Sequence, residues 1–293
     1  MDETVVALGQ MGPKAVAGVF LLLLAVETIF PLRKRKRERA GRYFVNFALT
    51  MAAFVVGTFV VRRTALMLAY SGEQSGFGLL RLVDLPVGAQ FAAGFLLMDL
   101  TFYYWHRANH EVGILWRFHN VHHVDQDLDV TTSFRFHFVE VLYSTCFRAA
   151  QVGILGVSPL TYAAYELIFT CETAFHHSNL RFPLGVERII NKIIVTPRMH
   201  GIHHSAVKDE TNSNYSVIFR WWDALHGTLR LGVRQPDIVI GVPAYQAPAD
   251  NRVWSLIVMP FAGQREYWAF ANGYASLTRG PEGANRQDRL MLE

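Results

Sequence analysis

The sequence predicts a helical protein embedded in a membrane, and three observations support this fold class. Apolar residues make up 51% of the 293 residues and charged residues only 18%, which is an unusually apolar balance for a soluble protein. Several apolar stretches are long enough to cross the hydrocarbon core of a bilayer as helices. One of these stretches is followed directly by a dense basic run, which is typical of the cytoplasmic end of a spanning helix.

The first predicted spanning helix covers residues 16–32, and only Glu27 and Thr28 interrupt its apolar character. Six basic residues follow within residues 33–39. A secretory signal would carry its positive charge before the apolar region, so we expect this segment to stay in the mature chain as a membrane helix.

The second predicted spanning helix covers residues 44–61, which contain no charged side chain. Arg62 and Arg63 would then lie on the far side of the membrane. The heavier basic charge of residues 33–39 outweighs these two arginines and places that loop in the cytoplasm and the start of the chain outside.

Further apolar stretches predict a third crossing and a hairpin. Residues 87–104 carry only Asp99 and return the chain to the cytoplasm. Residues 138–175 form two apolar stretches hinged at Ser158 and Pro159, and we expect a hairpin that enters the membrane and comes back.

Two charged residues, Arg148 and Glu166, lie inside this hairpin. A charge at such depth costs roughly 2.5 to 3.5 kcal/mol on insertion scales. We therefore expect these side chains to face protein or each other.

Composition also excludes several classes of protein. Cys146 and Cys171 are the only cysteines, which argues against a disulfide scaffold and against a cysteine-rich zinc or iron–sulfur site. The net charge is only +4 and no domain-sized basic stripe occurs, so nucleic-acid binding is not expected.

All 12 histidines fall between His106 and His226, and most of them form spaced groups. The pattern HxxHH occurs twice. Histidines three and four residues apart lie on one face of a helix and can bind the same metal ion. An isolated histidine is more often a hydrogen-bonded core residue, but the two HxxHH groups favour a metal site. The groups are His106 and His110; His119, His122 and His123; His176 and His177; and His200, His203 and His204.

The number and position of these histidines predict the kind of metal site. One zinc ion needs at most four protein ligands, so eight to ten histidines suit two ions. Imidazole is a suitable ligand for iron, copper, nickel or zinc. The motifs follow apolar helices, where a site would meet lipid chains whose difficult bonds are C–H bonds, and redox-inactive zinc cannot oxidise those. The residues alone therefore favour two redox-active ions.

Three histidine motifs occur in the order HRANH, HNVHH and HGIHH, accompanied by TTSFR at 131–135, FHHSN at 175–179, NSNYS at 212–216 and WWDALHGT at 221–228. Over residues 99–231 the chain resembles the sterol desaturase and fatty acid hydroxylase superfamily. The resemblance implies an all-α membrane enzyme with about four spanning helices and a cytosolic helical cap that holds a histidine-rich di-metal site.

The resemblance also implies a ligand set. Glu172 stands where some relatives have a histidine, and it is either a ligand or a residue supporting one. His177 and His137 are similarly open as ligands or supporting residues, whereas we expect His226 to be structural and Asp223 to cap or pair. The implied metal ligands are His106, His110, His119, His122, His123, His176, His200, His203 and His204.

The implied activity is dioxygen-dependent hydroxylation or desaturation of a C–H bond in a membrane lipid, with two non-haem iron ions. The sequence has no GxGxxG stretch, cysteine cluster or haem-binding motif, so we expect a separate electron-transfer protein to supply electrons. The basic residues 33–39 could bind an acidic electron carrier or anionic lipid headgroups. We favour the simpler role, in which their positive charge keeps this loop on the cytoplasmic side of the membrane. The alternatives are a membrane zinc hydrolase and a non-catalytic metal-binding membrane protein.

The predicted organisation has three regions. Residues 1–98 hold the N-terminal membrane helices and the basic loop, 99–231 form the catalytic domain with its hairpin, and 232–293 form a cytosolic segment with a loose tail from Arg279. The histidine motifs are expected on the cytoplasmic side. The lack of a retention signal at 290–293 favours a bacterial inner membrane over the endoplasmic reticulum.

Overall fold

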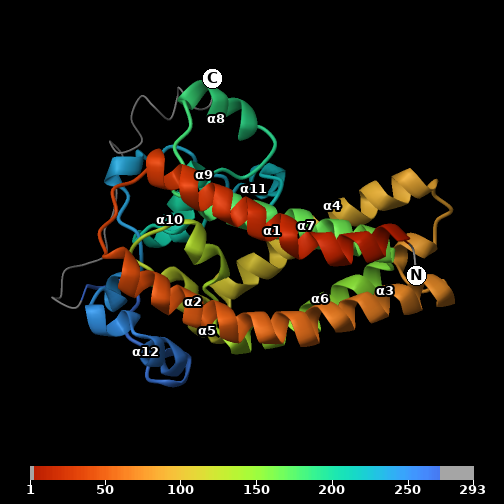
Figure 1. The fold of residues 1–293 in the computed structure, drawn as a ribbon, viewed down its shortest axis with the longest axis horizontal. Coiled ribbons are helices and arrows are strands. Elements are labelled where there is room, and N and C mark those ends of the chain that lie inside the picture. The colour runs from red at the N-terminus through yellow and green to blue at the C-terminus, as the bar shows by residue number, and fades with distance from the viewer. Residues whose placement is uncertain (1–2, 271–293) are drawn as a thin grey trace.

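A computed structural model describes residues 3–270, and this part of the chain is built from helices (Figure 1). Six long helices are α1 (Glu3–Ile29), α2 (Arg39–Val56), α3 (Arg63–Ser75), α4 (Val87–Glu111), α6 (Phe138–Leu155) and α7 (Pro159–His177). The shorter ones are α5 (Gly113–His123), α8 (Leu184–Ile190), α9 (Pro197–His203), α10 (Lys208–Thr211), α11 (Trp221–His226) and α12 (Val253–Val258). Strand-like pairing in the described residues is confined to isolated bridges such as Pro31 with Leu180. The all-α prediction is confirmed.

The long helices run along the longest axis of the molecule, and the short helices gather at one end (Figure 1). Helix α1 packs on α7, α3 on α6, and α4 on α5, α6 and α7. Helix α9 joins the short-helix end to α7. The C-terminal ends of α4 and α7, which carry histidines, therefore meet α5 and α9 at the junction between the two parts.

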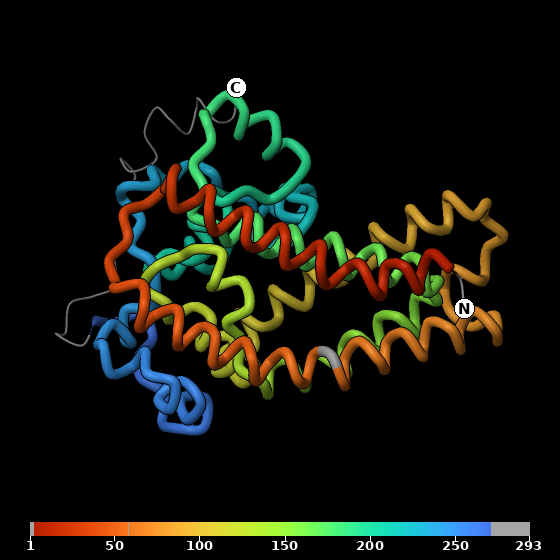
Figure 2. The backbone as a smooth tube through the Cα atoms, in the orientation of Figure 1, coloured from red at the N-terminus to blue at the C-terminus, as the bar shows by residue number. Residues whose placement is uncertain are grey.

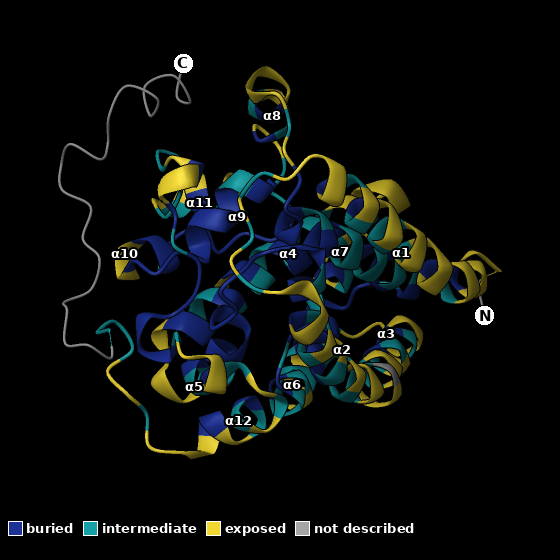
Figure 3. Ribbon diagram, turned by 60° about the vertical axis from the view of Figure 1, so that its left-hand side comes forward, coloured by how far each residue is buried: buried dark blue, intermediate teal, exposed yellow. Residues whose placement is uncertain are grey.

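Three helical segments are long and apolar enough to cross a membrane: Glu3–Ile29, Arg39–Arg81 and Phe138–Leu155. Large apolar side chains such as Leu21, Phe47 and Phe54 remain exposed on their outer surfaces. Figure 3 shows these exposed surfaces along α1, α2 and α3 and the buried residues around α4, α7 and α9. Since water would not favour such a surface, the bundle is a membrane bundle. Helices α4 and α7 are less apolar than these three segments and pack between the other helices of the bundle.

The second membrane helix is longer than predicted. It does not end at Arg62 and Arg63 but passes through a π-helix, Gly57–Arg62, directly into α3 (Figure 2). The arginines do not stop it, because arginine is a good helix former and residues 62–71 contain neither glycine nor proline. The first helix is also longer, since it begins at Glu3 instead of residue 16.

The predicted hairpin is present as α6 and α7. The hydroxyl of Ser158 accepts a hydrogen bond from the backbone N–H of Thr161 at 3.1 Å, and Pro159 occupies the first turn of α7, so both residues start the helix as their types favour. Gly156 caps the C-terminal end of helix α6, and a Cβ on Gly78 would lie 2.3 Å from the Cα of Gly156. The loops at this end of the bundle approach so closely that only glycine fits.

The charges inside the hairpin face each other, as predicted. Nη2 of Arg148 lies 3.0 Å from Oε1 of Glu166. The Arg148 side chain is 7% exposed, so pairing offsets the cost of a cation at membrane depth.

The basic run between α1 and α2 is partly built into the fold. Arg33 donates hydrogen bonds to the carbonyl of Pro197 and the side chain of Gln235, and Arg35 pairs with Glu27 at 3.3 Å. Burial lowers the pKa of Arg33 to about 10. Part of the run therefore holds α9 against the membrane helices instead of serving only as a charged anchor.

The chain after α7 forms the short-helix end, with 3-10 turns at Gln235–Asp237, Pro243–Tyr245, Pro248–Asn251 and Met259–Phe261. Further 3-10 turns occur at Leu79–Arg81 and Val130–Phe134. The predicted tail from Arg279 lies outside the described residues.

Candidate metal centre

Two clusters of buried histidines form where the membrane helices meet the short helices. In each cluster the ring nitrogens that can bind a metal all lie within 4.8 Å of one another. Five residues make up the first cluster: His106, His110, His119, His123 and His203. Four make up the second cluster: His122, His177, His200 and His204.

The spacing of each motif explains how the clusters divide. His106 and His110 lie one turn apart on α4, and both enter the first cluster. The two HxxHH motifs instead contribute to both clusters, because adjacent histidines point in different directions around a helix. The clusters are neighbours, since the rings of His123 and His204 stack with centroids 4.3 Å apart.

Hydrogen bonds fix which nitrogen of several rings faces the first cluster. Nδ1 of His106 lies 2.7 Å from the carbonyl oxygen of Tyr215, and Nδ1 of His203 lies 2.7 Å from that of Ser213. A carbonyl only accepts, so these Nδ1 atoms carry the proton and Nε2 presents a lone pair. This arrangement is the usual support for a metal-binding histidine.

Glu140 plays the same part for His119. Its carboxylate accepts a hydrogen bond from Nδ1 of His119 at 2.8 Å, and Nε2 of His119 is buried without a hydrogen-bond partner among the described residues. We did not identify Glu140 from the sequence, since 21 residues separate it from His119. The signal available was its position three residues after His137 at the start of an apolar helix.

In the second cluster, ring nitrogens approach more closely than neutral rings favour. Nε2 of His177 lies 3.0 Å from Nε2 of both His122 and His200, and Nε2 of His204 lies 3.1 Å from that of His200. Nδ1 of His177 donates to the carbonyl of Thr173 at 2.7 Å, so its Nε2 has only a lone pair to offer.

Metal coordination accounts for this approach. A first-row metal binds imidazole nitrogen at about 2.1 Å, so two ligands at right angles lie about 3 Å apart. In the first cluster, Nε2 of His119, His123 and His203 and both nitrogens of His110 lack hydrogen-bond partners in the described part of the chain. Buried polar atoms without partners are costly, and ligation would satisfy one nitrogen of each ring. The donor set therefore fits bound metal.

The rings are in the form that binds metal. Burial, followed by the neighbouring imidazoles, lowers the pKa of His122, His123, His200 and His204 well below the ordinary value. The pKa of His203 is lowered to about 3, mainly by burial. Neutral rings with free lone pairs prevail at neutral pH.

The loop after α10 supplies the carbonyls that orient His106 and His203. Asp223 on α11 holds this loop, since its carboxylate accepts hydrogen bonds from the backbone N–H of Tyr215 at 2.8 Å and of Ser216 at 2.9 Å. Burial raises the pKa of Asp223 despite these bonds. The pairing role predicted for Asp223 matches this arrangement, which also gives a structural reason for the NSNYS and WWDALHGT motifs.

The TTSFR segment forms a second support beneath the clusters. Arg42 on α2 forms a bidentate pair with Asp125 at 2.8 Å, and Arg135 donates to Asn46 at 2.9 Å and to the carbonyl of Val121 at 3.1 Å. Burial alone would raise the pKa of Asp125, but Arg42 and Arg135 outweigh it and lower the value to about 2. These contacts tie α2 to the end of α5, which carries His122 and His123.

The structure places His177, whose role the sequence left open, in a cluster, and it leaves out His176, which was expected to be a ligand. His177 lies in the second cluster, whereas Nδ1 of His176 lies 4.0 Å from Oε1 of Glu172 and is outside both clusters. Glu172 is likewise outside them. The helix rotates by about 100° between adjacent residues, so sequence spacing did not decide which ring faces inward.

The two other histidines have structural contacts. The ring of His137 caps α6, accepting from the backbone N–H of Val139 at 3.2 Å and donating to the carbonyl of Ile257 at 3.1 Å. His226 stacks on Tyr103 with centroids 4.7 Å apart. The structural role expected for His226 agrees with its position.

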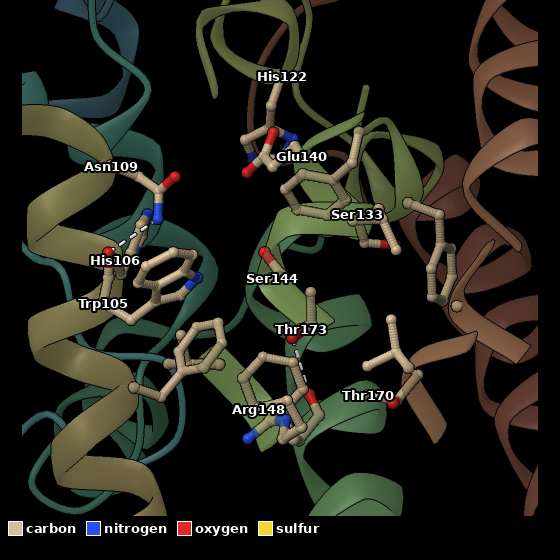
Figure 4. A pocket seen from close by; sticks show the side chains of 18 of the residues that line it. Trp105, His106, Asn109, His122, Ser133, Glu140, Ser144, Arg148, Thr170 and Thr173 are labelled. Atoms are coloured by element: carbon tan, nitrogen blue, oxygen red, sulfur yellow. Dashed lines mark hydrogen bonds between the residues drawn. The ribbon is translucent and has the colours of Figure 1, made fainter. Parts of the chain in front are cut away.

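A cavity of about 390 Å³ leads from the histidines into the membrane bundle (Figure 4). His122 and Glu140 lie at one end of the view and Arg148 at the other. Its walls are mainly apolar and include Phe102, Trp105 and Phe169. Five histidines of the two clusters thus line a chamber suited to an apolar chain.

Comparison with known proteins identifies similar sequences. The sequence model of the fatty acid hydroxylase family matches residues 91–228, which contain both histidine clusters. An ornithine lipid hydroxylase from Rhizobium tropici is 31% identical over 54% of this chain and 46% of its own length. Human alkylglycerol monooxygenase is 29% identical over 72% of this chain and 47% of its own, and mouse cholesterol 25-hydroxylase is 31% identical over 46% and 45%. The matched region thus spans about half the length of these relatives. No solved structure matches the chain.

Proposed function

Because the chain belongs to the sterol desaturase and fatty acid hydroxylase superfamily, we propose that it is a dioxygen-dependent lipid hydroxylase with two iron ions. The first cluster would hold one ion and the second cluster the other. The substrate would be a membrane lipid oxidised at a C–H bond. One oxygen atom of dioxygen would enter the lipid as a hydroxyl group, and the other would be reduced to water by two external electrons and two protons.

The observation that carries this proposal is the convergence of nine histidines beside an apolar cavity. Nine nitrogen donors exceed what one ion can use, which supports two ions. Bound iron would supply the redox chemistry needed to attack an unactivated C–H bond with dioxygen, which zinc lacks. Ring nitrogens without carboxylate in either cluster also disfavour magnesium, calcium and manganese.

The protein's own residues would orient the ligands and exclude water. Glu140 and the carbonyls of Tyr215 and Ser213 fix three rings of the first cluster in the tautomer that presents Nε2. The apolar walls around Phe102 and Trp105 would keep the reacting carbon dry and close to the ions. Desaturation would use the same residues, but the names of all three relatives favour hydroxylation.

We also propose that the metal centre faces the cytoplasm, because the basic loop after α1 lies at the same end of the bundle. Lys34 and Lys36 stay exposed in this loop, as does Arg39 at the start of α2. Electrons would come from a separate electron-transfer protein. A bacterial inner membrane remains the favoured location.

The test compares lipids from cells with and without the chain, grown in air. Wild type should make a hydroxylated lipid that is absent with His203→Ala and His122→Ala, and that persists with His226→Phe, which alters a histidine outside both clusters. Metal analysis of the purified proteins accompanies the profiling. A product that persists in both alanine variants, or an activity that needs zinc and no oxygen, would refute the proposal and favour a hydrolase.

A further inference from the structure

The cavity that begins at the histidines reaches an ion pair deep in the membrane bundle. Arg148 on α6 and Glu166 on α7 both line it, with Nη2 and Oε1 3.0 Å apart. Ten residues of α7 separate Glu166 from His176, which corresponds to about 15 Å along the helix. Charged groups at this depth are costly, so their position in a ligand chamber calls for a reason beyond helix packing.

Arg148 is held rigidly. Its guanidinium lies 5.4 Å from the ring centroids of Phe102 and Tyr165 and 5.6 Å from that of Phe169, and it donates to the side chain of Gln151. Gln151 is held in turn by the carbonyl of Met98 at 2.8 Å. The cation is therefore fixed before any ligand arrives.

Glu166 is less enclosed. Its side chain is 30% exposed while that of Arg148 is 7% exposed. A carboxylate has about four acceptor positions, and the contact with Arg148 uses only part of them. Glu166 therefore retains acceptor capacity toward the cavity.

We propose that the Arg148–Glu166 pair binds the hydroxyl group of an uncharged lipid alcohol, whose chain extends along the cavity to the metal centre. This inference rests on the proposed function for what happens at the metal end. The hydroxyl would donate to Glu166 and accept from Arg148, so it satisfies both charges and adds none.

Other polar groups suit the pair less well. A phosphate or carboxylate would bring a second anion beside Glu166 in an apolar chamber, where like charges repel strongly. A plain alkyl chain would cover the pair without offering it a hydrogen bond, which is costly. The favoured substrate therefore carries its hydroxyl about 15 Å from the carbon that is oxidised.

Binding without turnover tests this proposal directly. The full-length protein, purified in detergent and kept free of reductant, is titrated with radiolabelled hexadecan-1-ol and with hexadecane. Wild type should bind the alcohol at least about tenfold more tightly, because a hydrogen bond to a charged group contributes that much. In the double variant Arg148→Met/Glu166→Leu this preference should fall below about twofold.

The double replacement removes both charges together, since apolar replacement of a whole buried pair is often tolerated. Glu166→Gln, which keeps the shape of the pair, provides a second reading and should give an intermediate preference. The control variant Glu73→Gln changes a residue of α3 that pairs with Arg81 away from the cavity. This variant should keep the wild-type preference for the alcohol.

Equal binding of alcohol and alkane by wild type, or an unchanged preference in the folded double variant and in Glu166→Gln, would overturn the proposal. Failure of the proposed function has a different signature, because it removes oxygenated product without affecting binding measured in the absence of reductant.

Discussion

The Nε2 atoms of His122 and His177 lie 3.0 Å apart, although 55 residues separate the two histidines in the chain. His122 comes from the end of α5 and His177 from the end of α7. Since Nδ1 of His177 donates its proton to Thr173, its Nε2 lone pair points at a neighbouring imidazole. A shared metal ion is the simplest way to stabilise this approach.

The second cluster predicts different effects for two adjacent histidines. His177→Ala removes one of four ring donors, so metal content should fall from two ions to about one per chain. His176→Ala should retain both ions. Elemental analysis of the two purified variants distinguishes them, and a loss confined to His176→Ala would mean that the cluster is assigned to the wrong ring.

His176 and His177 show which part of the metal site the sequence predicts and which part it does not. The HxxHH spacing correctly predicted that separate motifs supply converging rings, because positions three and four apart share a helix face. It did not predict which ring at the end of α7 turns inward, since that depends on how α7 is rotated against α9. Rotation is set by packing between distant segments.

Glu140 should control the first cluster through His119. Glu140→Ala removes the acceptor for Nδ1 of His119, and losses of a partner of this kind typically cost about 10- to 100-fold in metal affinity or activity. Titration against a competing chelator measures the affinity. Glu111→Ala, which breaks an exposed pair with Arg107, is the matched control. Affinity within twofold of wild type in Glu140→Ala would show that the carboxylate is dispensable.

The cavity should be blocked by a large side chain at Ser144, which lines it on α6. Ser144→Trp should reduce lipid oxidation at least about tenfold while leaving metal content unchanged, because the indole displaces the chain from its reactive position. Cys146→Trp on the same helix points to an exposed position and should stay close to wild type. Product formation together with metal analysis checks both, and full activity of Ser144→Trp would place the substrate elsewhere.

The pair between Arg42 and Asp125 should determine stability. Arg42→Met removes the nearest cation from the buried carboxylates of Asp125 and Asp129 and leaves only the more distant arginines Arg135 and Arg35, and removal of one partner from such a buried pair costs about 3–5 kcal/mol. Thermal unfolding in detergent should show a clearly lower Tm. Arg39→Met, at an exposed position in the first turn of α2, should unfold as wild type does. Equal Tm values for both variants would contradict the role given to Arg42.

Other parts of the fold were predictable to different degrees. The hinge at Ser158 and Pro159 and the mutual pairing of Arg148 and Glu166 followed from local rules on helix starts and on charge in membranes. The run of α2 into α3 did not, because Arg62 and Arg63 resemble a membrane flank but leave the helix unbroken. The support from Glu140 required a contact between helices that no motif records.

The metal centre itself can be tested most directly by anomalous X-ray scattering at the iron edge from crystals of the purified protein. Two iron peaks per chain are expected, one among His106, His119 and His203 and the other among His122, His177 and His200. A single peak, zinc in place of iron, or rings without any anomalous peak between them would contradict the two-iron assignment.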